Sequence, residues 1–360
     1  MIDGAKVTVN LNALCRNALT LQNTVGDFWC VLKSDAYGHG LKECADALYQ
    51  SGQRRFAVFS LDEALAIRPI VLRSDILILG RTKSKYADLL VKNKCIQTVF
   101  SNEYLGELSP YSKDLRVHIK IDSGMNRTGF KCEAERIHKA FLGFSGQVEG
   151  VYTHFPAADS EDKTLTEKQL DRFLNKASEL EMFFGKTLLR HSAASAAALR
   201  IPKSRLDCAR IGLALYGILP ENCNGICSLE PSMSLEAPII SVHKVKKGES
   251  VGYGCDYIAD SDRIVATVAC GYTNGLSRIS AATLRPAISG ISVPILGRIC
   301  MDRCMLDVTQ LFDIGIILQP YEKAVFIGGK KTAVDFAASE KTIPYESLVR
   351  IGKLNEKEFV

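Results

Sequence analysis

The chain has 360 residues, 47% of them hydrophobic and 24% charged, with a formal net charge of +5. Its length allows one barrel-sized domain and a smaller companion, and its composition is ordinary for a soluble globular protein. Lysines and arginines are dispersed, which argues against nucleic acid as a partner. No apolar run approaches the roughly 20 residues of a membrane-spanning helix, which argues against a membrane protein.

Twelve cysteines are scattered along the chain without a C-x-x-C pair. The closest pairs, Cys223 with Cys227 and Cys300 with Cys304, have no histidine cluster nearby that would complete a zinc site. The first residues contain no apolar core of a signal peptide. We therefore expect free and mostly buried thiols, no bound metal, and a cytoplasmic location.

The first two thirds of the chain predict an α/β fold. The run Lys6–Asn10 predicts a strand, followed by an amphipathic helix with Asn10 as its N-cap. Helical patterns such as Leu41–Tyr49, Leu61–Ile67 and Thr164–Leu180 then alternate with short β-rich runs. These runs predict strands at Phe28–Leu32, Phe56–Ser60, Ile76–Leu79, Ile96–Phe100, Val117–Ile121, Val148–Thr153, Thr187–His191 and Cys208–Ile211. Eight such units favour a (β/α)8 TIM-type barrel, with a doubly wound open sheet as the alternative because periodicity does not show closure.

After Pro220 the pattern changes to short strands separated by turns, which favours a mainly-β domain. The predicted strands are Ile239–Val245, Ile264–Ala269, Ile291–Leu296, Met305–Val308 and Ala324–Ile327. We expect three parts: residues 1–10 as an N-terminal strand that packs with the β domain, residues 11–228 as the barrel, and residues 229–360 as the β domain.

In a closed barrel, catalytic groups belong at the carboxyl ends of the strands. Candidate residues do stand at or just beyond that end of the predicted strands: Lys33, Lys120, Asp122, Arg127, His154, His191, Ser195, Arg210 and Gly212. A lone histidine or arginine at a strand end is more often structural, but the joint placement of these residues favours a site.

Two features of these residues point to chemistry. Lys33 ends a buried apolar run, where burial lowers an amine's pKa and allows it to form an imine. Phosphate in such barrels is commonly held after the seventh and eighth strands, where Ser195 and Gly212 stand. Gly38 and Gly40 match the first two glycines of a dinucleotide-binding loop, but Glu43 stands where the third glycine would be. NAD is therefore disfavoured as a cofactor.

The run VLKSDAYGHG from Val31 to Gly40 resembles the lysine motif of alanine racemases, which bind pyridoxal phosphate. The other motifs that resemble this family are HIKIDSGMNRTG from His118, THFPAAD from Thr153, HSAASAA from His191, RIGLALYG from Arg210, GYG from Gly252, GYTNG from Gly271 and GRICMD from Gly297. Each motif is short, but their order over nearly the whole chain is specific. The chain is identified as a member of the alanine racemase family.

The resemblance implies that pyridoxal 5'-phosphate serves as cofactor and that two bases interconvert L-alanine and D-alanine, supplying D-alanine for peptidoglycan. Lys33 would hold the cofactor and handle the α-proton of the D-isomer, and Tyr272 would handle that of the L-isomer from the opposite face. Arg210 is expected at the pyridine nitrogen, where a guanidinium keeps its proton and restrains the cofactor as an electron sink.

The same resemblance assigns the other site residues. The cofactor is expected to contact Tyr37, His154, Ser195 and Arg210, and the backbone amides of Gly212 and Leu213. His154 is also expected beside Tyr272. The substrate carboxylate is expected at Arg127 and the amide of Met301, supported by Lys120 and Asp302. In the family the lysine equivalent to Lys120 can be carbamylated, and we treat this modification here as a hypothesis.

Family members are head-to-tail homodimers, so Tyr272 and Met301 are expected to act in the site of the other chain. The chain departs from the family pattern at Asn274, Leu276 and Ala194, and Phe359 falls where many members have a tyrosine near the phosphate. These changes put entrance shape, cofactor affinity and substrate breadth in question more than the type of reaction.

Three rival functions share parts of this scaffold. A cofactor-carrying barrel protein would lack the motifs around Tyr272 and Met301. A decarboxylase would place a carboxylate, and not Arg210, at the pyridine nitrogen. A racemase of serine or of broader specificity stays open, because one hydroxyl or methylene changes discrimination by only about 1–3 kcal/mol in an apolar pocket.

Overall fold

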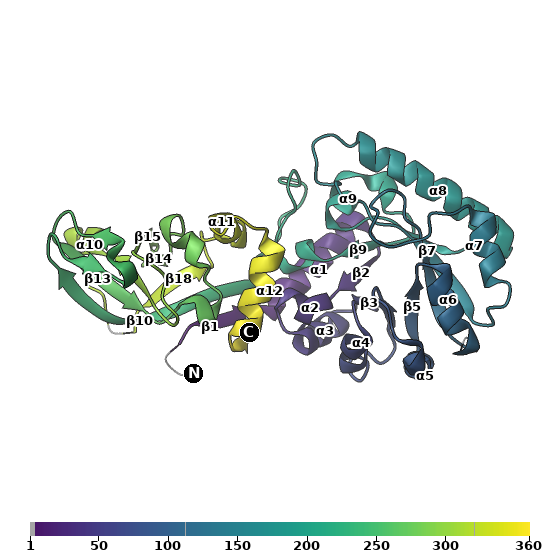
Figure 1. Cartoon of the computed structure of the whole chain (residues 1–360), viewed down its shortest axis with the longest axis horizontal. Helices are drawn as coiled ribbons and strands as arrows, with labels where there is room; N and C mark the ends of the chain where they lie inside the picture. Colours follow the sequence, from purple (N-terminus) through teal and green to yellow (C-terminus); the bar gives the residue numbers. More distant parts are fainter. Residues whose placement is uncertain (1–3, 112, 320) are drawn as a thin grey trace. The chain divides into compact units, whose positions relative to one another are not determined.

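The structure is a computed structural model that describes residues 4–111, 113–319 and 321–360. It divides into two compact units. The barrel unit comprises Asn12–Ala36 and Leu41–Glu230, and the β unit comprises the N-terminal residues through Leu11, Tyr37–Gly40 and Pro231–Val360. Figure 1 draws the barrel unit in purple to teal and most of the β unit in green to yellow.

The barrel unit contains a parallel sheet of eight strands in the order β8-β7-β6-β5-β4-β3-β2-β9. Their bounds are β2 Phe28–Val31, β3 Arg55–Val58, β4 Asp75–Ile78, β5 Cys95–Val99, β6 Arg116–Lys120, β7 Gln147–Tyr152, β8 Leu189–His191 and β9 Ala209–Ile211. An isolated bridge between Ala194 and Arg210 joins the end of β8 to β9 and nearly closes the ring. The predicted TIM-type barrel is confirmed, and the open doubly wound sheet is wrong.

Helices connect the strands of the barrel unit. Their bounds are α1 Leu11–Val25, α3 Leu41–Gln50, α4 Leu61–Ile67, α5 Ala87–Lys92, α6 Asn102–Leu108, α7 Ala134–Phe141, α8 Thr164–Phe184 and α9 Ser195–Arg200. The apolar spacing in the sequence accounts for the buried faces, as in α1, where Leu14, Ala18, Leu21 and Val25 are buried. No helix in the described part of the chain has both the length and the apolar character needed to span a membrane.

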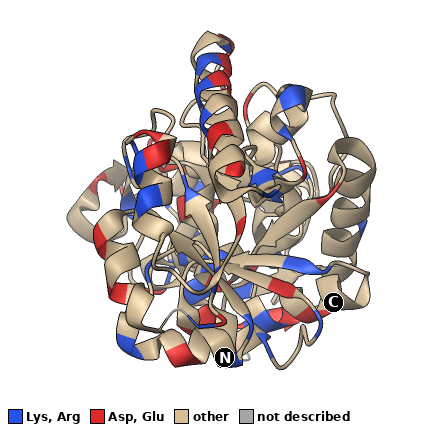
Figure 2. Ribbon diagram, turned by 90° about the vertical axis from the view of Figure 1, so that its right-hand side faces the viewer, with Lys and Arg blue, Asp and Glu red and all other residues tan. Residues whose placement is uncertain are grey.

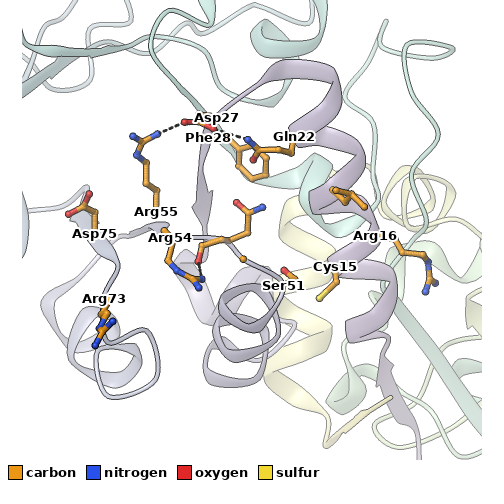
Figure 3. A pocket seen from close by; sticks show the side chains of 13 residues that line it. Cys15, Arg16, Gln22, Asp27, Phe28, Ser51, Arg54, Arg55, Arg73 and Asp75 are labelled. Carbon is orange, nitrogen blue, oxygen red and sulfur yellow. Dashed lines mark hydrogen bonds and ion pairs between the residues drawn. The ribbon is translucent and has the colours of Figure 1, made fainter.

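Ion pairs link different strands at the amino-terminal end of the barrel. Arg55 contacts Asp27 at 3.1 Å, and Arg116 contacts both Asp75 at 2.9 Å and Glu149 at 2.7 Å. A cavity of about 770 Å³ lies here, bordered by Arg54, Arg55, Arg73, Asp27 and Asp75 (Figure 3). Because both of these aspartates are paired with arginines and this end of a barrel usually serves stability, we assign these charges a structural role.

The β unit is built on a sheet of nine strands in the order β15-β14-β18-β10-β13-β17-β16, with β1 paired to both β10 and β19. The bounds are β1 Lys6–Val9, β10 Met233–Val245, β13 Arg263–Val268, β14 Ala287–Ile288, β15 Ile291–Ser292, β16 Ile295–Leu296, β17 Cys304–Asp307, β18 Lys323–Ile327 and β19 Lys357–Phe359. A separate hairpin joins β11 Ser250–Val251 to β12 Tyr257–Ile258. Phe359 lies in β19, opposite Val9.

The mainly-β character of this unit is confirmed, and one predicted strand in it is wrong in detail. The single strand expected at Ile291–Leu296 is two strands, β15 and β16, because Pro294 lacks the N–H that a continuous ladder requires. The mainly-β texture also hid three helices: α10 Thr309–Asp313, α11 Ala333–Ser339 and α12 Pro344–Leu354. Two of them carry start signals, since the Thr332 side chain accepts from the Asp335 amide and Pro344 occupies the first turn of α12.

Positively and negatively charged residues are intermixed along the ribbon (Figure 2). Figure 2 shows lysines and arginines interspersed with aspartates and glutamates over the helices of the viewed face. Many of them form short-range pairs, such as Lys139 with Glu135 at 2.7 Å one turn apart on α7. This mixture agrees with the dispersed charge of the sequence.

Candidate active site

Lys33 follows β2 and begins a left-handed helical turn, α2 Lys33–Tyr37. Ser34, Asp35, Ala36 and Tyr37 have φ values of 57°, 55°, 52° and 55°. Left-handed backbone costs an L-residue roughly 1–2 kcal/mol, so a run of four needs compensating contacts. The Ala36 amide donates to Leu32 O at 2.8 Å, and the Leu41 amide donates to Asp35 Oδ1 at 2.7 Å.

Glu63 supplies a further contact to this turn. Its Oε1 accepts from the Ser34 amide at 2.7 Å, while its Oε2 accepts from the amides of Phe59 at 2.7 Å and Ser60 at 3.2 Å. Ser60 and Glu63 form a capping box at the start of α4. One carboxylate therefore starts a helix and ties the end of β3 to the turn that carries Lys33.

Two lysines at the carboxyl end of the barrel have lowered pKa values. Burial lowers the pKa of Lys33, the guanidiniums of Arg127 and Arg210 lower it further, and Glu63 opposes them. Lys120 ends β6 and is 7% exposed; burial, followed by Arg127 and Arg210, lowers its pKa to about 8. Its ammonium donates to Thr128 Oγ1. Both amines are therefore easier to deprotonate than a surface lysine.

Arg127 lies in the loop after β6 and is exposed. Asp122 Oδ1 shapes the loop by accepting from the amides of Gly124 at 2.9 Å and Asn126 at 3.1 Å. Within residues 4–111, 113–319 and 321–360, the Arg127 guanidinium makes no hydrogen bond or ion pair. It lies close enough to lower the pKa of Lys33, Lys120 and His154, so it is a cation available to an anionic ligand.

Arg210 in β9 is 4% exposed and is held through both terminal nitrogens. Nη1 donates to the His191 carbonyl at 2.8 Å, and Nη2 donates to the carbonyls of Thr153 at 2.6 Å and Ser192 at 3.1 Å. Burial lowers its pKa to about 10, which leaves it charged at neutral pH. Its Nε has no acceptor among the described residues, so one N–H remains for a ligand.

Arg210 also fixes which ring nitrogen carries the proton in the buried histidine His191, which is hydrogen-bonded to His118. A guanidinium only donates, so His191 Nδ1, 2.9 Å from Nη1, must accept. The proton of His191 therefore sits on Nε2, which donates to His118 Nδ1 at 2.9 Å. Burial lowers the pKa of both histidines, that of His118 to about 3. The neutral pair of His118 and His191 thus orients the Arg210 guanidinium. The position of His118 in a sequence motif did not reveal this role.

His154 follows β7 and faces the same guanidinium. Its Nδ1 accepts from Arg210 Nη2 at 3.4 Å, and burial followed by Arg210 lowers its pKa well below the usual value. The neutral ring with Nδ1 as acceptor carries its proton on Nε2. His154 therefore has a donor left on the side away from Arg210.

Ser195, Gly212 and Leu213 lie together beyond β8 and β9. Ser195 begins α9 and is 5% exposed, and its Oγ accepts from the Gly212 amide at 3.1 Å. Leu213 begins a short 3-10 turn, Leu213–Tyr216. A hydroxyl beside backbone amides at this end of a barrel suits the oxygens of a phosphate.

The remaining predicted residues belong to the β unit. Tyr37 is buried, its ring centroid lies 5.9 Å from that of Tyr345, and burial raises its pKa. Tyr272 begins the 3-10 turn Tyr272–Asn274 and is 40% exposed, while Met301 is 54% exposed. The Tyr272 amide donates to Cys300 O and the Thr273 amide to Met301 O, both at 3.1 Å.

Asp302 completes this group. The Thr273 hydroxyl lies 2.9 Å from Asp302 Oδ1 and 2.9 Å from Met301 O. The structure thus brings Tyr272, Met301 and Asp302 together on two paired loops. It separately brings Lys33, Lys120, Arg127, His154, Ser195, Arg210, Gly212 and Leu213 to the carboxyl end of the barrel strands.

Sequence reasoning missed Glu63, His118 and Tyr152 as parts of the barrel group. Glu63 had a readable signal, since it stands three residues after the N-cap Ser60. Tyr152 lies under the cations, with its ring centroid 4.9 Å from Arg210 Cζ and 6.0 Å from Lys120 Nζ. It is the last residue of β7 and had no separate signal.

Comparison with known proteins agrees with this geometry. The chain matches the alanine racemase N-terminal domain over residues 9–220 and the alanine racemase C-terminal domain over residues 232–359. It is 35% identical over 354 residues to the alanine racemase of Listeria innocua, covering 94% of this chain and 93% of that protein. It is 34% identical over 336 residues to alanine racemase 1 of Clostridium acetobutylicum, covering 90% and 86%.

Solved structures give the same answer. The alanine racemase of Clostridium difficile has a TM-score of 0.91 at 30% identity, covering 99% of this chain and 96% of that one. The alanine racemase of Bacillus anthracis with bound L-Ala-P has a TM-score of 0.89 at 31% identity, covering 99% and 95%. The chain belongs to the alanine racemase family and is an isomerase of that family.

Proposed function

We propose that this chain interconverts L-alanine and D-alanine with pyridoxal 5'-phosphate, using Lys33 and Tyr272 as proton carriers. The observation that supports this most is the environment of Arg210. Its two terminal nitrogens are saturated by protein acceptors, and its Nε–H is left over. A single donor on a cation that keeps its proton suits the unprotonated nitrogen of a pyridine ring.

The barrel residues fit the cofactor in three further ways. Lys33 has an amine of lowered pKa for covalent attachment to the aldehyde. Ser195 and the amides of Gly212 and Leu213 would bind the phosphate together with Tyr37. When bound, pyridoxal phosphate takes up the negative charge left on the α-carbon after proton removal. Arg210 would limit that uptake by not transferring its proton, which favours reprotonation over side reactions.

The two proton carriers act on opposite faces in this proposal. Lys33, displaced by substrate, removes or returns the α-proton of the D-isomer, and the partner subunit's Tyr272 does so for the L-isomer. The His154 Nε2–H, left free by the Arg210 contact at Nδ1, would donate to the phenolate oxygen. A donor at that oxygen would hold the phenol in place for proton transfer.

The substrate carboxylate would bind the Arg127 guanidinium, with the Met301 amide supplied by the other chain and Asp302 supporting it. Arg127 and Arg210 both repel the charged form of Lys120. A carbamate on Lys120 would convert this repulsion into attraction and orient Arg127. The proposed assembly is a homodimer. The proposed compartment is the cytoplasm, because all twelve thiols are free. The proposed role is the supply of D-alanine for peptidoglycan.

The decisive experiment follows α-proton exchange in D2O with Tyr272→Phe. Both directions of a racemisation with an equilibrium constant of one must slow together, so overall rates do not separate the bases. We expect racemisation to fall by about 10²–10⁴-fold, exchange from L-alanine to fall with it, and exchange from D-alanine to persist through Lys33.

The control is Lys33→Ala, which should lose the covalently bound chromophore and both exchanges. Unchanged racemisation or unchanged L-alanine exchange in Tyr272→Phe would remove Tyr272 as the second base. L-serine run beside L-alanine on the wild-type enzyme, followed by circular dichroism, decides the open question of substrate preference.

A further inference from the structure

The phenol of Tyr272 is positioned by its backbone. The side chain is 40% exposed, and the turn that carries it spans only Tyr272–Asn274 between Gly271 and Gly275. Gly271 lies against the loop of Cys300 and Met301, where an added Cβ would stand 2.2 Å from Met301 O. This loop fixes the first half of the turn.

Helix α12 fixes the second half. Asn274 Nδ2 donates to Asn355 Oδ1 at 3.0 Å, just beyond the end of α12. Asn355 Nδ2 donates in return to the carbonyl of Asn274 and to that of Ile351, each at 2.9 Å. Arg350 Nε donates to Gly275 O at 3.0 Å. Three of these four bonds reach the tyrosine turn from one helix.

The orientation of each amide is dictated by its other bonds. Asn274 Oδ1 accepts from the Gly271 amide at 3.1 Å, so its Nδ2 faces Asn355. Asn355 Nδ2 is taken by two carbonyls, so its Oδ1 faces Asn274. The pair is therefore reciprocal, and alanine at either position removes the bond between the two side chains.

We propose that Asn274 and Asn355 form a positioning pair that sets the location of the Tyr272 phenol for proton transfer. The proposal rests on the function proposed for Tyr272. Neither amide needs to touch substrate, since each acts by holding the backbone on which the phenol stands. Proton transfer is sensitive to such placement, because a displacement of about 1 Å can cost about 100-fold.

The test measures α-proton exchange of each alanine isomer in D2O with the full-length, cofactor-loaded enzyme. In Asn355→Ala and in Asn274→Ala we expect exchange from L-alanine to fall by about 10–100-fold, while exchange from D-alanine stays within about twofold of wild type. The double variant should lose less than the two single losses combined, because the two side chains share one hydrogen bond that either substitution removes.

A second measurement needs no cofactor. Amide hydrogen exchange in the cofactor-free protein should rise in the segment 271–277 of Asn355→Ala and nowhere else in the sheet. The matched control is Thr342→Val, which removes the hydrogen bond from the Thr342 hydroxyl to Glu346 at the opposite end of α12. It should leave both isomer exchanges and the protection of 271–277 unchanged.

Several results would overturn the pair. L-alanine exchange at the wild-type rate in Asn355→Ala would do so, and so would a proportional fall for both isomers, which indicates general loss of structure. If Tyr272→Phe itself keeps L-alanine exchange, the proposed second base fails, whatever the asparagine variants do. The two failures are therefore distinguishable.

Discussion

Lys120 is a buried amine among cations. It is 7% exposed, and its pKa of about 8 results first from burial and then from Arg127 and Arg210. Below pH 8 the amine is mostly protonated, and this charge in a buried cationic site costs folding free energy. About half of the amine is neutral at pH 8 and about a tenth at pH 7. Carbon dioxide reacts with the neutral amine, so this site suits carbamate formation.

We expect a carbamate on Lys120 when the protein is incubated with ¹³C-labelled bicarbonate. The carbamate should form more readily at pH 8 than at pH 7, because the neutral amine is the reacting form. Carbon-13 NMR, backed by high-resolution mass spectrometry under conditions that preserve carbamates, measures it. Lys120→Ala is the control, and a spectrum identical to that of this variant would refute the modification.

Single residues differ in how far the sequence could predict them. Lys33, Arg127 and Tyr272 stand in motifs whose chemistry can be read directly. The free Nε of Arg210 could not be predicted, because it depends on acceptors from β7 and β8 that meet only in the closed barrel. The left-handed turn after Lys33 was equally hidden, since Ser34, Asp35 and Ala36 have no strong preference for positive φ.

Among the elements, α12 makes a close backbone contact at Gly352. A Cβ added at Gly352 would stand 1.9 Å from Gly38 O, and one added at Gly38 would stand 2.3 Å from Leu348 O. Tyr345 on the same helix packs against Tyr37. The motif Tyr37–Gly40 therefore requires a helix surface without side chains, and both glycines are explained by one interface.

Gly352→Ala tests this interface against helix propensity. Propensity alone predicts a gain of up to about 1 kcal/mol in unfolding free energy, whereas the steric conflict with Gly38 predicts a loss of about 1–3 kcal/mol or more. We expect the loss, measured by urea denaturation. Gly106→Ala in α6 is the matched control, since nothing lies within 4 Å of its added Cβ, and it should stabilise the protein. Equal stabilisation by both changes would contradict the steric argument.

Elements of the barrel were predictable because each strand is a short apolar run with its own boundary signals. The strand at Ile291–Leu296 was wrong because Pro294 interrupts pairing in the middle of an otherwise apolar run. Helices α11 and α12 were missed because the strand-rich context outweighed two start signals, the N-cap Thr332 and Pro344 in the first turn of α12. Local signals were present in each case, but their importance could be judged only once the pairing of the strands in the sheet was known.

At the scale of the whole molecule, the proposed function needs a second copy of the chain. The β unit exposes Tyr253 by 72%, Tyr272 by 40% and Met301 by 54%. Apolar side chains that gather on one surface mark contact sites, so we expect a partner to cover this group. A symmetric homodimer would bury the same surface on each chain and complete two identical sites.

Mixing two inactive variants tests this assembly. In a hybrid of Lys33→Ala with Tyr272→Phe, one site receives an intact lysine and an intact tyrosine from different chains. We expect about a quarter of wild-type activity after random reassortment, since half of the dimers are hybrids with one working site. No recovery despite verified hybrid formation would show that both bases come from one chain.

The reverse mixture is the control for the same experiment. Wild type combined with the double variant Lys33→Ala, Tyr272→Phe should form hybrids in which each site lacks one base. Activity should then fall to about a quarter of that of undiluted wild type. A fall to only one half would indicate independent chains.

The glycine contact on α12 has a further consequence in such a dimer. One face of the helix supports the segment that follows Lys33, and its end supports the turn of Tyr272. These two groups would serve different reaction centres. A mutation or bound compound that shifts α12 by a fraction of an ångström would therefore disturb Lys33 in one active site and Tyr272 in the other at the same time. Changes in this helix would alter both active sites together.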